Sequence, residues 1–303
     1  MKETFFSIVI TAYNCEKYIK QCIFSVLNQN FGEYELIIID DCSSDNTLKI
    51  IENIKDNRIK IFSLPQNLGV SNARNIAIDA SKGEYIFFLD SDDYIENNLL
   101  KEAHDMLLNT KDDVLFCPYF VYWENKNKYK FSNPSYRMDK IKKLPCHFHK
   151  KEAQNLIYET NYEICTKFYK RSFLLDNNIY FKPLLFAEDL PFYWEVMQKA
   201  QKFSHLKKQY YCYRKGHKEL DVQKVVEYLP HALKVSKEYL PDEKDIFYKK
   251  SAKMLNFWLI KTNFDKKLYN FAHFFCKNEK ILDINSPFLR LKYKILLKLF
   301  GKI

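Results

Sequence analysis

Residues Gly83–Asp93 read GEYIFFLDSDD, and the architecture of the chain can be worked out from this segment. The apolar and aromatic run Tyr85–Leu89 is typical of a strand that is buried on both faces. Three carboxylates follow it directly, at Asp90, Asp92 and Asp93. Because adjacent carboxylates repel one another, their collection at the end of a buried strand indicates a bound cation. The alternative is an N-capping turn in which Asp93 begins the next helix, which accounts for one carboxylate and not for three.

Strand-like and helix-like segments alternate around this run through the first 120 residues. Apolar, β-branched runs predict strands at 5–12, 34–39, 59–64, 85–89 and 114–123. Apolar residues at helical spacing predict helices at 16–29, 45–54 (with Asp45 as N-cap), 70–80 and 98–108. The alternation predicts an α/β fold with a Rossmann-like, doubly wound and mostly parallel sheet. Residues 124–150 form a polar, basic loop to which the pattern assigns no structure, and residues 151–215 mix helix with short strands.

Polar residues follow three of the predicted strands at the point where each one ends. They are Thr11–Asn14, the pair Asp40-Asp41 and the carboxylates of 90–93. Ligands bind beyond the carboxyl ends of the strands in sheets of this class. Ordinary turns account for one such cluster, whereas three in register predict a binding site. Their hard oxygen atoms suit Mg²⁺ or Mn²⁺, which commonly neutralise substrate phosphates.

The glycines exclude one way of binding phosphate. The chain has five, at positions 32, 69, 83, 216 and 301, and no spacing matches G-x-G-x-x-G or a Walker loop. A backbone cradle of that kind is therefore excluded, so that phosphate must be handled by a metal ion or by side chains.

Charge divides the chain into two unlike parts. Of 48 Lys+Arg and 38 Asp+Glu, residues 1–120 hold 11 basic and 19 acidic side chains, and residues 121–303 hold 37 and 19. The basic second part predicts an anionic partner, such as membrane lipid, a phosphorylated acceptor or nucleic acid. None of the eight cysteines forms a C-x-x-C pair, which indicates buried thiols in a reducing compartment. Without a signal-peptide pattern, or an apolar run of the roughly 18–20 residues that span a bilayer, the predicted location is cytoplasmic.

From residue 222 onward the pattern is helical, and it ends in a basic amphipathic segment. Phe288–Ile303 reads FLRLKYKILLKLFGKI, with Arg290, Lys294, Lys298 and Lys302 on one arc of a helix and apolar residues opposite. This composition is typical of a helix that lies in a membrane interface. It predicts peripheral association with the anionic, cytoplasmic face of the inner membrane. The alternative is a terminal helix packed on the domain with its lysines solvated.

Five motifs occur in a characteristic order: SIVITAYN at 7–14, LIIIDDCSSD at 36–45, NLGVSNARN at 67–75, GEYIFFLDSDD at 83–93 and AED at 187–189. In this order and spacing the chain resembles the family-2 glycosyltransferases, whose fold is the glycosyltransferase A type. The similarity covers about residues 5–215. It implies a catalytic domain at 1–215, with a nucleotide-sugar half at 1–120 and an acceptor half at 121–215. A helical C-terminal region follows at 216–303, possessing none of the motifs.

The resemblance assigns four residues to the nucleotide. Thr11, Tyr13 and Asp41 would hold the base and ribose, with Asp41 accepting from the uracil imide N–H. Arg74 lies where the family often has a basic residue of the nucleotide pocket. Two positions depart from the family pattern: Thr11 replaces a common proline, and Cys42 stands where Gly or Asn is usual, which alters the turn beside the base.

The resemblance also assigns the metal and the base. Asp90 and Asp92 are the D-x-D pair, with Asp92 the direct ligand of Mn²⁺ or Mg²⁺ and Asp90 also beside the nucleotide. Asp189 would be the base that takes the acceptor's proton, although Glu188-Asp189 also fits a simple helix start. His217 lies where some members place a further metal or diphosphate contact, and a solvated histidine is the alternative. Lys167 and Arg214 are further candidates for contact with diphosphate or acceptor, with surface charge as the default interpretation.

These assignments predict a metal-dependent, inverting glycosyltransferase. It would move a sugar from a nucleotide sugar, a UDP-sugar first of all, to a hydroxyl of a glycan or lipid-linked saccharide in bacterial surface polysaccharide or lipooligosaccharide synthesis. One alternative is a sugar-nucleotide nucleotidyltransferase, which usually has the Gly-rich loop that is missing here. The other is a non-catalytic basic protein that binds membranes or nucleic acid. Charge alone does not account for the carboxylates at the strand ends, so we expect no nucleic-acid partner.

Overall fold

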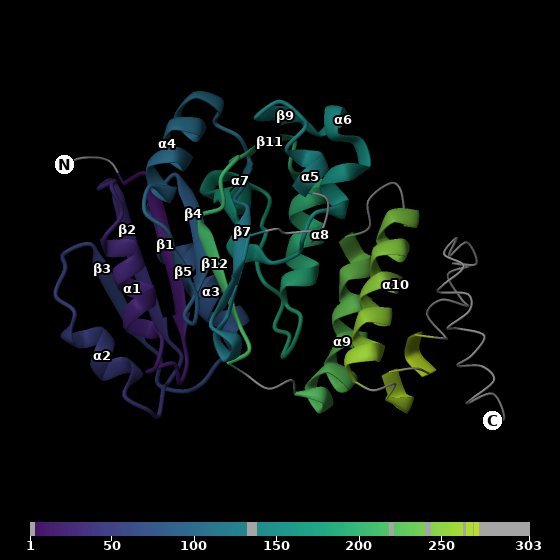
Figure 1. The fold of residues 1–303 in the computed structure, drawn as a ribbon, viewed down its shortest axis with the longest axis horizontal. Helices are drawn as coiled ribbons and strands as arrows, with labels where there is room; N and C mark the ends of the chain where they lie inside the picture. Colours follow the sequence, from purple (N-terminus) through teal and green to yellow (C-terminus); the bar gives the residue numbers. More distant parts are fainter. Residues whose placement is uncertain are drawn as a thin grey trace.

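The computed structural model describes residues 4–131, 138–217, 221–239, 244–262, 265–268 and 270–272. An eight-stranded sheet with the order β3-β2-β1-β4-β10-β6-β11-β9 forms its centre (Figure 1). The strands are β1 (Phe6–Ala12), β2 (Tyr34–Asp40), β3 (Ile59–Ser63), β4 (Tyr85–Asp90), β6 (Val114–Phe116), β9 (His147–His149), β10 (Lys167–Lys170) and β11 (Lys202–His205). Strands β3, β2, β1 and β4 are mutually parallel, while β10 runs antiparallel to β4 and to β6. The prediction of a doubly wound, mostly parallel sheet is confirmed.

Helices cover both faces of this sheet because alternate residues of each strand point to opposite sides. Ile8 and Ile10 of β1 lie in the same core as α1 (Ile19–Leu27) and α4 (Leu99–Thr110). Val9 lies in the opposite core, beneath α3 (Val70–Ala80) and α8 (Asp189–Lys199). The short helices α2 (Thr47–Asn53) and α7 (Arg171–Asp176) complete the layers. The four helices predicted before residue 110 are therefore confirmed, with ends that differ by a few residues.

The predicted strand at 114–123 is wrong, since it is two strands in different sheets. It breaks at Cys117-Pro118, because proline lacks the N–H that a central strand needs. The second half, β7 (Tyr119–Trp123), joins a small sheet with the order β5-β12-β7-β8. Its other strands are β5 (Tyr94–Ile95), β8 (Lys128–Lys130) and β12 (Tyr211–Lys215). Because β5 follows Asp93 directly, the alternative in which Asp93 begins a helix is also wrong.

The segment between β7 and α8 contains more regular structure than its sequence pattern indicated. It holds the 3₁₀ turns η1 (Glu124–Lys126), η3 (Gln154–Glu159) and η4 (Ile164–Thr166), and the short helices α5 (Met138–Ile141) and α6 (Lys150–Ala153). The turn η4 leads directly into β10 and contacts β4, with Cys165 near Asp90 at the end of that strand.

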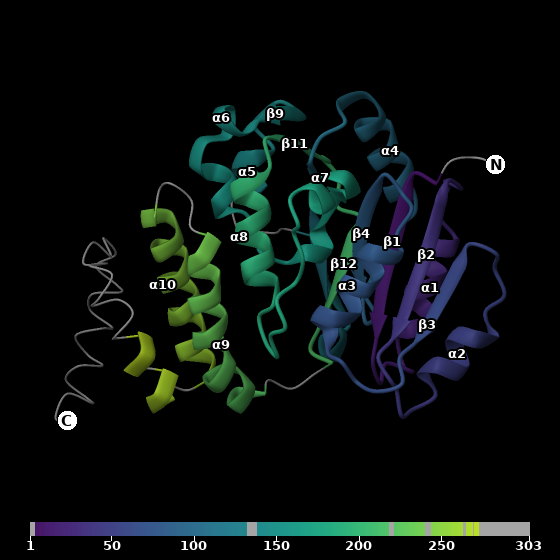
Figure 2. The same ribbon diagram turned by 180° about the vertical axis from the view of Figure 1, so that it is seen from behind.

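Two helices of the C-terminal region pack beside α8, as the views from both sides show (Figures 1 and 2). They are α9 (Val222–Ser236) and α10 (Lys244–Lys261), linked by η5 (Lys237–Tyr239). Asp221 caps α9 by accepting from the Lys224 N–H at 2.9 Å. In the described part of the chain no helix is long and apolar enough to cross a membrane. The basic segment Phe288–Ile303 lies outside the described residues.

Candidate active site

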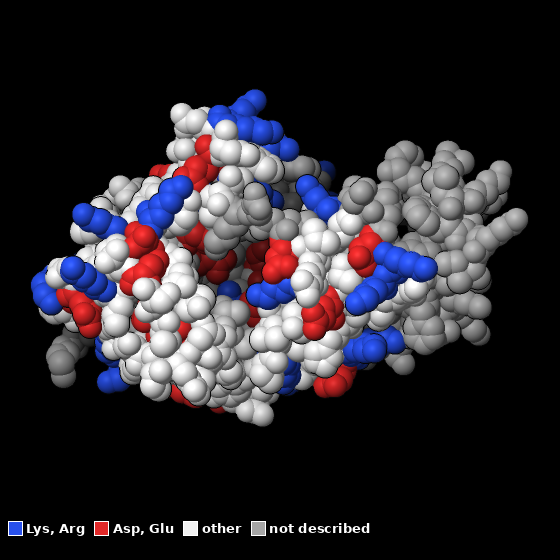
Figure 3. Space-filling view, turned by 90° about the horizontal axis from the view of Figure 1, so that it is seen from below, with Lys and Arg blue, Asp and Glu red and all other residues white. Residues whose placement is uncertain are grey.

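The carboxyl ends of β1, β2 and β4 meet at one edge of the large sheet. In the view onto this edge, acidic side chains gather around a hollow, with some basic side chains among them (Figure 3). Thr11 is paired in register with Asp90 on β4, so the two predicted site residues lie on adjacent strands. Tyr13, just past β1, is 52% exposed and therefore accessible to a ligand.

Asp41 fastens the loop that leads into α3. Its Oδ1 accepts from the Leu68 N–H at 2.7 Å and its Oδ2 from the Gly69 N–H at 2.9 Å. Each carboxylate oxygen has a second lone pair, so this buried side chain retains capacity to accept from a ligand. Cys42, the residue that departs from the family pattern, has a φ of 62°. That left-handed conformation explains why glycine or asparagine suits the position.

His217 lies against the D-x-D segment. Its Nε2 is 2.9 Å from Asp92 Oδ2, and its side chain is only 7% exposed. The interpretation of His217 as a solvated turn residue is therefore wrong. The other ring nitrogen, Nδ1, is buried and has no hydrogen-bond partner among the residues that the structure describes. A buried polar atom without a partner is rare, which makes Nδ1 a candidate contact for a ligand.

Arg214 is buried and holds the turn that contains Asp92 and Asp93. Its Nε donates to the Asp92 carbonyl oxygen at 2.7 Å, and its backbone N–H donates to Asp93 Oδ1 at 2.7 Å. The hydroxyl of Tyr211 donates to the other oxygen of the Asp93 carboxyl. The default interpretation of Arg214 as a surface charge is wrong, because it fixes the backbone of the D-x-D turn instead.

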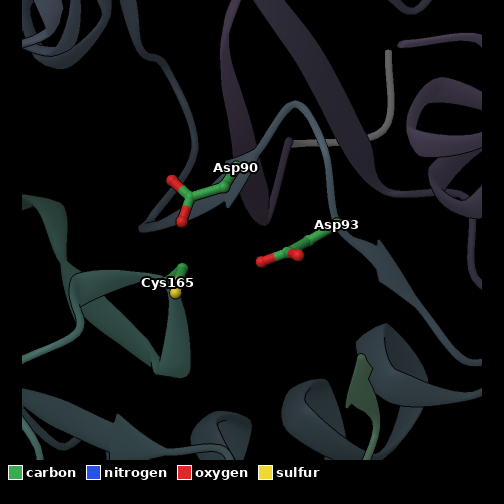
Figure 4. A group of neighbouring side chains, drawn as sticks. All are labelled: Asp90, Asp93 and Cys165. Carbon is green, nitrogen blue, oxygen red and sulfur yellow. The ribbon is translucent and has the colours of Figure 1, made fainter. Parts of the chain in front are cut away.

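Asp90, Asp93 and Cys165 point toward one another from β4, the following turn and η4 (Figure 4). One potential ligand atom of each lies within 4.8 Å of the others. Burial raises the pKa of the Asp93 carboxyl and of the Cys165 thiol, which favours their neutral forms. Since Asp93 is also occupied by Tyr211 and Arg214, we interpret it as support for the turn rather than as a ligand.

The remaining donors fit the divalent cation that the sequence implies. The side chain of Asp90 is 34% exposed. Asp92 follows two residues later, and its carboxylate contacts His217. Carboxylate oxygen is preferred by both Mg²⁺ and Mn²⁺, and an imidazole nitrogen is tolerated best by the transition metal.

Arg74 connects the D-x-D pair to the predicted base. Its Nη1 lies 2.8 Å from Glu188 Oε1 and 3.0 Å from Asp189 Oδ1, and its Nη2 lies 3.3 Å from Asp90 Oδ1. The guanidinium is buried, and the ring of Phe181 lies beneath it at 5.2 Å. One cation thus neutralises part of the charge of three carboxylates.

Asp189 is the first residue of α8, where the positive end of the helix dipole favours an anion. The Ile164 N–H makes a long hydrogen bond of 3.5 Å to its Oδ2. Burial raises the pKa of Asp189 to about 8, and the nearby charge of Arg74 opposes this rise. Ala187, two residues earlier, has a φ of 56°, which is strained for a residue that has a Cβ.

Lys167, like Arg214, has a basic side chain whose burial the sequence did not predict. It is fully buried at the start of β10, so its default interpretation as a surface charge is wrong. Sequence reasoning also missed Glu188 and Cys165 as neighbours of the site. Glu188 stands next to the predicted base and could have been included on that ground, whereas no pattern marks Cys165.

The comparisons with known proteins identify the family of the chain. The family model described as glycosyl transferase family 2 matches residues 7–176. An uncharacterised glycosyltransferase of Haemophilus influenzae is 47% identical over 118 residues, which are 37% of this chain and 47% of that protein. The poly(ribitol-phosphate) β-N-acetylglucosaminyltransferase TarS of Staphylococcus aureus is 32% identical over 217 residues, covering 69% of this chain and 35% of TarS. The chain thus spans less than half the length of either relative.

Solved structures give the same result. The crystal structure of S. aureus TarS 1–349 in complex with UDP aligns with a TM-score of 0.65 and 27% identity, over 84% of this chain and 72% of that one. The complex of the same protein with UDP-GlcNAc aligns with a TM-score of 0.64 and 28% identity, over 83% and 72%. With the matched motifs at the strand ends, these likenesses establish the family: the chain belongs to glycosyl transferase family 2, with the glycosyltransferase A-type fold.

Proposed function

We propose that this protein is a metal-dependent, inverting glycosyltransferase that uses a UDP-sugar. The arrangement around Arg74 supports the proposal best, because it sets the carboxyl of Asp189 beside the D-x-D carboxylate of Asp90. A base on one side and a diphosphate site on the other are what a single displacement at an anomeric carbon requires. The UDP and UDP-GlcNAc complexes of TarS support a uridine nucleotide as donor.

Each part of the site has a task in this reaction. Thr11, Tyr13 and Asp41 bind the base and ribose. Asp90, Asp92 and His217 would hold Mn²⁺ or Mg²⁺, and the bound ion supplies positive charge beside the departing diphosphate.

Asp189 accepts the proton of the acceptor hydroxyl while the oxygen of that hydroxyl forms the new bond to the anomeric carbon. The bond from that carbon to the diphosphate breaks, and UDP leaves with the electron pair. Arg74 favours the ionised form of Asp189 that can accept the proton.

The acceptor is proposed more broadly, as a glycan or lipid-linked saccharide of the bacterial surface. The relatives include TarS and the minor teichoic acid biosynthesis protein GgaA of Bacillus subtilis, whose names refer to cell-surface polymers. In this proposal residues 1–215 form the catalytic domain, and residues 216–303 add a helical region that holds 18 basic and 10 acidic side chains.

Nucleotide protection against heat tests the donor half of the proposal. We expect UDP with Mn²⁺ to raise the melting temperature, whereas GDP, CMP, and UDP with EDTA do so far less. At 100 times the Kd a ligand stabilises the folded state by about 2.7 kcal/mol. The Asp92→Asn variant should lose the Mn²⁺-dependent part of this shift. Asp105→Asn, at an exposed pair with Lys101 on α4, is the matched control and should keep it. Equal shifts with all three nucleotides would contradict the proposal.

Membrane association is a separate prediction of the basic C-terminal segment. The full chain should sediment with vesicles that contain anionic lipid, and less so at high salt, because polybasic segments bind such surfaces electrostatically. Deleting residues 286–303 should abolish sedimentation without changing the UDP-dependent melting shift. Unchanged sedimentation of the shortened chain would contradict the assignment of membrane binding to this segment, and a full chain that does not sediment would contradict a peripheral location at the membrane.

A further inference from the structure

Residues 160–166 lie beside the predicted base and are held by a buried ammonium group. Lys167 Nζ donates to the carbonyl oxygens of Asn161 at 2.9 Å and of Glu163 at 2.8 Å. It also lies 3.2 Å from Thr166 Oγ1. This segment has only one 3₁₀ turn, so its buried carbonyls need donors from elsewhere. Lys167 supplies them from its fully buried position.

A second lysine reaches the same segment from the C-terminal helices. Lys250 of α10 donates from Nζ to the Thr160 carbonyl oxygen, and its Nζ lies 3.9 Å from the centroid of the Tyr193 ring. The Tyr193 hydroxyl on α8 in turn donates to the carbonyl oxygens of Ile157 at 2.9 Å and of Thr160 at 3.2 Å. Helix α10 is thus connected by a hydrogen bond to Thr160, and does not merely pack beside α8.

Residues 160–166 include the Ile164 amide, which contacts the predicted catalytic base Asp189. The Ile164 N–H points at Asp189 Oδ2, and Cys165 lies against the D-x-D segment. The distance of 3.5 Å from Ile164 N to Oδ2 is at the long limit of a hydrogen bond, and catalytic hydrogen bonds are often long in a structure without substrate. Any shift of residues 160–166 therefore changes the orientation of the carboxyl that accepts the proton.

We propose that Lys167 and Lys250 are positioning residues, which hold residues 160–166 so that the Ile164 amide orients Asp189 toward the acceptor hydroxyl. This inference rests on the proposed function, and it gives α10 a part in sugar transfer. The competing explanation is that both lysines serve stability alone. The two differ in what happens to turnover in a variant that still folds and still binds the donor.

Steady-state kinetics of UDP release separate the two explanations. We use UDP-GlcNAc and UDP-glucose as donors, with Mn²⁺ and with water or a simple glycoside as acceptor. Lys167→Met should lower kcat about tenfold or more and Lys250→Met about threefold, since small misplacements of reacting groups are costly. The KM for the donor and the melting shift with UDP and Mn²⁺ should stay unchanged. Lys199→Met is the control, because Lys199 Nζ also donates to a backbone carbonyl, that of Asn177 at 2.9 Å, but at the far end of α8. It should leave kcat unchanged.

Hydrogen exchange of the peptide that covers residues 160–166 gives a readout that does not depend on turnover. Both variants should exchange faster there, and Lys199→Met should not. Unchanged exchange in both variants would overturn the inference, whether or not the protein turns over a UDP-sugar. Absence of turnover in the wild type would by itself contradict only the proposed function. Unchanged kcat in a folded variant whose segment exchanges faster would also overturn it. Should Lys167→Met fail to fold, Lys250→Met decides by the same two measurements.

Discussion

Replacing Asp189 by asparagine should lower the rate of sugar transfer by about 10² to 10⁴-fold, the range that a positioned general base contributes. The amide keeps the size of the carboxyl and one oxygen that can face Arg74, so the fold should persist. It cannot accept the proton of the attacking hydroxyl. Binding of UDP with Mn²⁺ should be unchanged, because the donor side of the site is intact. Initial rates of UDP release, measured beside the melting shift, check both expectations.

Glu188→Gln is the matched control for this experiment. Glu188 and Asp189 are adjacent and both contact Nη1 of Arg74, at 2.8 Å and 3.0 Å. If the carboxylates served only to neutralise Arg74, the two variants would lose activity alike. We expect Glu188→Gln to keep at least a tenth of the wild-type rate, in line with a role in charge balance alone. Equal losses would show that Asp189 is not the base.

The largest effect on stability should follow from Arg74→Met. The change removes the buried cation shared by Asp90, Glu188 and Asp189, and breaking a buried pair costs about 3–5 kcal/mol. Denaturant unfolding measures the loss. Arg58→Met is the control, because Arg58 makes a more exposed pair with Asp56 and should cost about 1 kcal/mol or less. A loss no greater than that of the control would mean that Arg74 does not stabilise the carboxylates.

The loss caused by Arg74→Met should also depend on pH in a defined direction. Burial raises the pKa of Asp189 to about 8 in the folded state, above its ordinary value of 3.8, and Arg74 keeps it from rising further. Without Arg74 the folded variant holds this proton to higher pH, while both unfolded chains have already released it. The difference in unfolding free energy between wild type and variant should therefore widen as pH rises through 8. A difference that narrows over this range would contradict the assigned contact.

Local pattern sufficed for the first half of the fold. Apart from β5, the strands and helices before residue 110 follow from apolar spacing, because each buries one stripe or run of its own residues. The segment 114–123 was mistaken for one strand because its apolar run gives no hint of a change of sheet, although Pro118 marks the place. Sequence also identified Asp41, Asp90, Asp92 and Asp189 as candidates, since strand ends and motif order carry that information.

The contacts between these candidates could not be predicted. Arg74 meets Glu188 across 114 positions and His217 meets Asp92 across 125, distances over which no periodicity in the chain relates two residues. The burial of lysine and arginine side chains could not be predicted from the sequence either. Lys167 is tolerated inside because backbone carbonyls of its own neighbourhood surround it, a condition that arises only once residues 160–166 have folded.

The turn of residues 91–93 joins the two sheets, since β4 of the large sheet ends at Asp90 and β5 of the small sheet begins at Tyr94. Both ends of the turn are thus fixed by strand pairing, and Arg214 of β12 braces its middle. The conformational entropy cost of aligning the D-x-D carboxylates is met when the chain folds. It does not recur each time a substrate binds. The D-x-D carboxylates are accordingly held in place by the framework before any nucleotide arrives.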